Sequence, residues 1–127
     1  MMRIISKSLL LLVLPLFVAS CSTTSITNLT PSLMDRNPTG QYMVEMEVDT
    51  SQQTLIPTSV NPMVIVGFEA YPMRPTKRTV NRWEGLVPIP PGKSEIAYHF
   101  KVDYEYKRFG KPGKGSLMSP EYKLAIR

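Results

Sequence analysis

Cysteine and histidine are scarce in this chain, which has one residue of each type among 127. A single cysteine excludes a disulfide within the chain, so a folded domain must depend on its apolar core. One histidine excludes zinc sites built from cysteine and histidine, and the dense acidic loop typical of calcium sites is also missing. There is no G-x-S-x-G motif, and any Ser/His/Asp set would have to include His99. We therefore expect no catalytic residues, no metal and no cofactor.

Long apolar runs are also scarce, and the one that is present lies near the amino terminus. Residues 9–19 are almost wholly apolar, but a membrane-spanning helix needs about 20 such residues, and Pro15 interrupts the run. Arg3 and Lys7 precede the run, and small residues follow it immediately before Cys21. A charged segment, a short apolar segment and a small-residue cleavage site are together typical of an export signal.

The sequence Val18-Ala19-Ser20-Cys21 resembles the lipobox of bacterial lipoproteins. The resemblance implies that residues 1–20 are a lipoprotein signal peptide and that Cys21 is lipidated as the first residue of the mature protein. Val18 stands where the family usually has leucine, and Ser22 stands where aspartate commonly marks retention in the inner membrane. The resemblance therefore implies a lipid anchor in the cell envelope, at the outer membrane facing the periplasm or at the cell surface.

Neither sign of charge dominates the mature chain. Removal of residues 1–20 leaves 107 residues, the length of one domain, with 13 basic and 10 acidic side chains. A difference this small does not indicate a nucleic-acid partner, because nucleic-acid binding usually requires a basic stripe across the domain.

The mature chain changes character near residue 39. Residues 22–38 are mostly polar, and we expect residues 21–38 to be the lipidated cysteine and a flexible tether with a reach of at most about 55–60 Å. From Gly40 onward, apolar and polar residues alternate with the period of a half-buried strand. Residues 39–127 are therefore expected to be the folded domain.

Alternation places the expected strands at residues 42–48, 63–70, 79–88, 96–106 and 122–126, with a further short strand within residues 52–60. A bulge near Gly85 is expected where the third run loses its alternation. Residues 107–118 are expected to be a loop. Because no apolar stripe has the period of a helix, we expect an all-β, two-sheet sandwich of about six or seven strands.

This outline resembles the immunoglobulin-like sandwiches of cell-surface proteins. The resemblance depends on a Tyr-x-Val-x-Met-x-Val first strand that begins at Tyr42 and a Tyr-x-Leu-x-Ile last strand that begins at Tyr122. Antibody-type domains are excluded, because the chain has no Cys–Trp–Cys framework.

Basic residues gather in two places. The 107–118 segment carries four cations and no acidic residue, and the cations are Lys107, Arg108, Lys111 and Lys114. They are consistent with a solvated connection between strands, or with contact to an anionic membrane, where each would contribute about 1 kcal/mol. The same two interpretations apply to the second group, which is Arg74, Lys77, Arg78 and Arg82.

Three aromatic residues are candidates for contact with a ligand. Tyr71 lies beside a proline turn and Phe109 lies among the cations, so both are expected to be exposed. Trp83 has the same parity as Val87, which favours a place in the core.

The leading functional hypothesis is a lipid-anchored, non-enzymatic envelope protein that binds or assembles with a protein, an envelope polymer or an anionic surface. A carbohydrate-binding module is an alternative, which an exposed Trp83 beside Tyr71 would support. Further alternatives are an accessory subunit that docks by an edge strand and a small envelope hydrolase that uses His99 with Asp103 or Glu45.

Overall fold

The computed structural model describes residues 23–127, which contain ten strands and one short 3-10 helix. The signal peptide expected over residues 1–20 and the lipidated Cys21 lie outside the described residues. Across residues 23–127, no helix has the length and apolar character needed to span a membrane.

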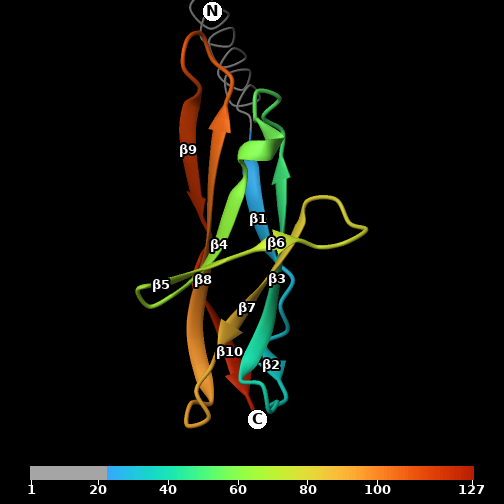
Figure 1. Ribbon diagram of the computed structural model, residues 1–127, viewed down its shortest axis with the longest axis vertical. Helices are drawn as coiled ribbons and strands as arrows, with labels where there is room; N and C mark the ends of the chain where they lie inside the picture. Colours follow the sequence, from blue (N-terminus) through green and yellow to red (C-terminus); the bar gives the residue numbers. More distant parts are fainter. Residues whose placement is uncertain (1–22) are drawn as a thin grey trace, which may run out of the picture.

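The strands form two sheets that enclose one apolar core (Figure 1). The strand order in the first sheet is β1 (Thr24–Asn28), β3 (Gln41–Thr50), β7 (Arg82–Pro88) and β6 (Arg74–Pro75). The order in the second sheet is β2 (Leu33–Met34), β10 (Tyr122–Ile126), β8 (Glu95–Tyr106), β4 (Asn61–Val66) and β5 (Glu69–Pro72), and β9 (Gly113–Met118) also pairs with β8.

The order of the strands is that of an immunoglobulin-like sandwich. In chain order, β1, β3, β6 and β7 take the places of strands A, B, D and E in one sheet, and β4, β8 and β9–β10 take those of C, F and G in the other. After β1 the chain crosses to the second sheet, where β2 pairs in parallel with β10. The predicted all-β, two-sheet immunoglobulin-like fold is confirmed. The strands are more numerous than expected because several are short.

Alternation identified the core strands correctly. Tyr42, Val44, Met46 and Val48 of β3 are buried, as are Ile96, Tyr98, Phe100 and Val102 of β8 and Leu124 and Ile126 of β10. The rings of Tyr98, Phe100 and Tyr122 pack with centroids 5.6–6.0 Å apart. Burial of these apolar faces is the main source of stability in a domain that has no disulfide.

One hydrogen bond joins the two sheets through the core. The side-chain amide of Asn28 on β1 donates to the hydroxyl of Tyr98 on β8 over 2.9 Å. Tyr98 is only 1% exposed, so the bond satisfies a hydroxyl group that would otherwise be buried without a partner.

The tether expected over residues 21–38 is wrong for most of its length. Residues 24–28 form β1, which pairs with β3 from Thr24 opposite Thr50 to Asn28 opposite Met46. Ile26 packs against the core, and β2 lies further along the same segment. The folded domain therefore begins near residue 24 instead of residue 39, and only Ser22 and Thr23 separate Cys21 from β1.

Three other local predictions need correction. The run at residues 63–70 is a hairpin, in which β4 and β5 are joined by a two-residue turn at Gly67 and Phe68. Residues 52–60 form no strand and contain a single bridge from Leu55 to Tyr106 and the 3-10 helix Pro57–Ser59.

The bulge expected near Gly85 is absent, because the β3–β7 register runs without a break from Gln41–Pro88 to Glu47–Arg82. Gly85 is instead required for close packing. A Cβ atom there would lie 3.1 Å from Cγ of Met73 and 3.2 Å from the carbonyl oxygen of Pro72.

If residues 24–28 are a structural strand, Ile26→Ala should lower the free energy of unfolding by about 1–2 kcal/mol, because a half-buried apolar side chain is lost from the core. Urea denaturation would measure the change. Thr27→Ala, which alters the exposed neighbour on the same strand, is the matched control and should change stability by less than about 0.5 kcal/mol. Equal, negligible effects for both variants would restore the tether interpretation.

Candidate functional site

Thr23, the first described residue, is held at one end of the sandwich by hydrogen bonds. Thr23 is clamped to Ser51: the Ser51 amide donates to the Thr23 carbonyl over 2.8 Å, and the Thr23 amide donates to Ser51 Oγ over 2.7 Å. Three residues after Ser51, the carbonyl of Thr54 accepts a hydrogen bond from the Lys107 amide over 2.8 Å. This bond links the segment after Ser51 to the residue that follows β8. Thr23 and the start of the β8–β9 connection therefore lie at the same end of the molecule (Figure 1).

The prediction of a loop over residues 107–118 is wrong for its second half. Residues 113–118 form β9, which pairs with β8 from Gly113 opposite Tyr106 to Met118 opposite Lys101. We call the remaining connection, residues 107–112, the basic loop. Its conformation is supported by a hydrogen bond from Arg108 Nε to the Lys111 carbonyl over 2.9 Å and by a positive φ of 89° at Gly110.

The four basic residues of this region are divided between the basic loop and β9. Lys107, Arg108 and Lys111 are exposed in the basic loop, whereas Lys114 lies on β9 in register with Glu105 on β8. The loop itself therefore contains three cations and no carboxylate.

Two glycines of the segment that was expected to be a loop belong to β9 and pack against tyrosine rings of β8. A Cβ atom at Gly115 would lie 2.5 Å from Cζ of Tyr104, and one at Gly113 would lie 2.2 Å from Cζ of Tyr106. Each tyrosine ring thus covers the glycine opposite it, and the cross-strand pair replaces the packing that a glycine cannot provide. The signal in the sequence was the Tyr-x-Tyr of residues 104–106 matched by the Gly-x-Gly of residues 113–115.

The three candidate aromatic residues are not brought together. Phe109 is fully exposed at the tip of the basic loop. Trp83 and Tyr71 are half-buried in different sheets, where they pack against the core and lie in register with Met46 and Val64. No flat surface is formed by Trp83 and Tyr71, which is the arrangement that the carbohydrate-binding alternative requires.

The second basic group is partly neutralised. Arg74 forms an ion pair with Glu84 at 3.2 Å, and Arg82 lies in register with Glu47. Lys77 and Arg78 are exposed in the connection that leads to β7. This group therefore has acidic neighbours that the basic loop lacks.

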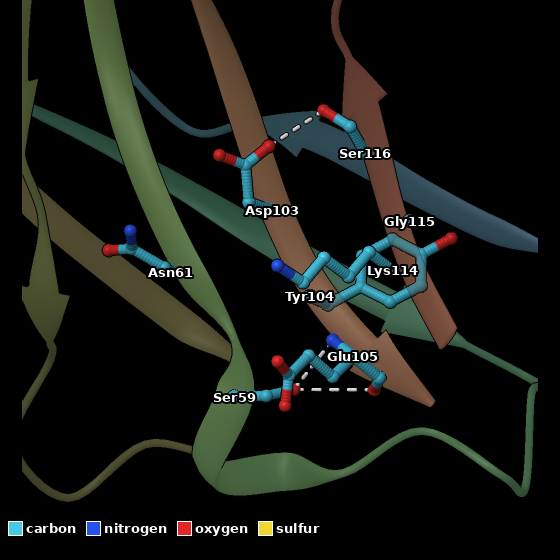
Figure 2. Close-up of a pocket in the computed structure, with 8 residues that line it drawn as sticks. All are labelled: Ser59, Asn61, Asp103, Tyr104, Glu105, Lys114, Gly115 and Ser116. Carbon is cyan, nitrogen blue, oxygen red and sulfur yellow. Dashed lines mark hydrogen bonds between the residues drawn. The ribbon is translucent and has the colours of Figure 1, made fainter. Parts of the chain in front are cut away.

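A groove of about 620 Å³ runs over the outer face of β4, β8 and β9 (Figure 2). Ser116 Oγ donates to Asp103 Oδ1 over 2.7 Å, and Ser59 Oγ accepts from the Glu105 amide over 2.8 Å. The lining residues are Ser59, Asn61, Asp103, Tyr104, Glu105, Lys114, Gly115 and Ser116. The groove offers donors and acceptors to a polar molecule, but among its lining residues there is neither a histidine nor a cysteine.

The histidine pairs proposed for a hydrolase are not assembled. His99 lies on the outer face of β8 in register with Ile65, and Asp103 is four residues further along the same strand, about 13 Å away. Glu45 lies on the outer face of the other sheet. Within residues 23–127, no group of three or more His, Cys, Asp or Glu residues is arranged to hold a metal ion.

No protein-family model and no curated protein matches this chain. The solved structures that are similar in fold include two with a TM-score of 0.46 and 9% sequence identity each. One is a DUF4785 family protein from Legionella pneumophila, for which the match covers 84% of this chain and 29% of that protein. The other is murine CRIg, for which the match covers 83% of this chain and 98% of that one.

The packing of the β8–β9 hairpin can be tested at Gly115. Gly115→Ala should lower the free energy of unfolding by about 1–2 kcal/mol, because the new Cβ displaces the half-buried ring of Tyr104. Thermal or urea denaturation would measure the loss. Gly92→Ala is the control, since open space surrounds Gly92 and its stability change should stay within about 0.5 kcal/mol. A Gly115→Ala protein as stable as the control would contradict the proposed packing.

Proposed function

We propose that this protein is a lipid-anchored lipoprotein of the cell envelope, whose sandwich has a non-enzymatic binding or assembly role. The observation that carries the proposal is the short distance along the chain between the lipobox-like cysteine and the first strand. Cys21 precedes Thr23 by two residues, and Thr23 is held by three hydrogen bonds to Ser51.

The short link supports a role close to the membrane. Two residues span at most about 7 Å, so a lipid on Cys21 would hold the sandwich directly against the bilayer surface instead of on a long leash. More than one fatty chain is needed for stable attachment, and a lipobox cysteine with several acyl chains would supply it. Ser22, which replaces the retention aspartate, supports the outer membrane or the cell surface as the location.

An exposed strand edge supports assembly with a protein partner. Within residues 23–127, β9 pairs with β8 on one side only, and no strand covers its other edge. Lys114 is the one charged residue among its six. An unpaired edge with few charges can accept a strand from a partner through main-chain hydrogen bonds.

Lipidation can be tested at Cys21 itself. Cys21→Ala should abolish labelling by fatty acid and leave an uncleaved precursor, because the acceptor thiol of the lipobox is lost. Radiolabelled palmitate and the mass of the product would report both effects. Ser22→Ala is the control and should be labelled and processed like the natural protein. A normally matured, unlabelled product from the natural chain would contradict the proposal.

The edge of β9 can be tested by crosslinking in cells. A photo-reactive residue in place of Lys114 should capture a protein, because it lies beside the open edge. The matched control is the same residue in place of Lys123, which is exposed on β10, a strand paired on both sides. Equal capture from both positions, or from neither, would contradict an assembly role for β9.

A further inference from the structure

We infer that the basic loop, residues 107–112, is a second membrane contact. In this arrangement Lys107, Arg108 and Lys111 lie among anionic phospholipid headgroups, and Phe109 inserts between them. The inference rests on the proposed anchoring at Cys21 and adds a surface, a ligand class and an orientation to it.

The first argument is position. The chain leaves the described structure at Thr23, and Ser51, Thr54 and their main-chain hydrogen bonds connect Thr23 to Lys107. β1 also contacts β9. In Figure 1 the β8–β9 hairpin reaches beyond the start of β1 at this end, while the carboxyl terminus lies at the opposite end. A lipid within about 7 Å of Thr23 would therefore bring the tip of the hairpin to the bilayer surface.

The second argument is charge. Residues 23–28, 50–60 and 107–112 all reach this end of the molecule, and the only charged side chains in these three segments are the three cations of the basic loop. The opposite end carries both signs, and its Arg127 forms an ion pair with Asp35 at 2.9 Å. Nearby carboxylates, such as Glu105 opposite Lys114, belong to the strands and not to the loops. The charge distribution therefore favours contact with an anionic surface at this end over the opposite end.

The third argument is the exposed aromatic ring. Phe109 is fully exposed and has a cation on either side within two residues. An apolar ring flanked by Lys and Arg is suited to the boundary between headgroups and acyl chains, where the ring is buried and the cations stay with the phosphates. The hydrogen bond from Arg108 to the Lys111 carbonyl holds this tip in a defined shape.

Two attachment points would orient the sandwich. A lipid on Cys21 alone would leave the domain free to rotate about a two-residue link. A second contact through the basic loop would remove that freedom and present the open edge of β9 at a constant height above the bilayer. The membrane contact thus deepens the proposed binding role by fixing which surfaces a partner can reach.

The inference can be tested on the purified acylated protein in vesicles. Phe109→Cys places a bimane probe at the tip of the basic loop, and Lys93→Cys places the same probe in the turn at the opposite end. Vesicles of phosphatidylcholine alone are compared with vesicles that also contain phosphatidylglycerol. Mass spectrometry of each preparation establishes whether Cys21 is acylated.

We expect the probe at position 109 to shift its emission to the blue and to resist quenching by aqueous iodide in the anionic vesicles, whereas the probe at position 93 stays in water. Replacement of Lys107, Arg108 and Lys111 by Gln should reduce the ratio of docked to free loop about fivefold per cation, or roughly a hundredfold together. The fold should be unaffected, with a thermal midpoint close to that of the natural protein.

The outcomes separate the two proposals. An acylated protein whose probe at position 109 remains in water overturns the membrane contact alone and leaves the anchor intact; the loop would then be free for a protein or polymer partner. A protein without acyl chains on Cys21 overturns both. A response that is the same in neutral and anionic vesicles overturns the electrostatic part of the inference, because the three cations would then contribute nothing.

Discussion

The inner face of β8 is the constraint on which the rest of the molecule depends. Its buried residues Tyr98, Phe100 and Val102 stand at the centre of the second sheet and face β3 across the core. In antibody domains a disulfide between the corresponding strands joins the sheets. Here, within residues 23–127, the sheets are joined by apolar packing and by the hydrogen bond between Asn28 and Tyr98. Because Asn28 belongs to β1, the first strand is tied to the centre of the domain.

The hydrogen bond between Asn28 and Tyr98 determines where the proposed anchor would lie relative to the folded domain. With β1 fixed to β3 and its last residue bonded to Tyr98, the chain has no slack between the core and Thr23. The amino-terminal end therefore has a definite position relative to the basic loop. The functional proposals follow from this rigidity, since a long tether would have separated the anchor from every surface of the domain.

The fold could be predicted from the sequence where side chains alternate strongly. β3, β8 and β10 were predicted in this way, because apolar residues at every second position share one face in a strand but not in a helix. β1 and β9 were missed because they consist largely of Thr, Ser, Asn, Gly and Lys, and their partners supply the packing: Met46 and Val48 lie opposite residues of β1, and Tyr104 and Tyr106 cover the glycines of β9. The cations of the candidate site were visible in the sequence. Their place beside Thr23 was not, because it depends on long-range pairing through residues 50–60.

The direction of β1 also has a mechanical consequence. β1 begins at the end of the sandwich where the described chain starts and runs antiparallel to β3, with five residue pairs between Thr24–Thr50 and Asn28–Met46. A pull on the amino terminus along the strand axis would load these pairs together in shear, instead of breaking them one after another as in a zipper. The pairing of β1 therefore makes the sandwich resistant to tension applied at Thr23 along the strand axis.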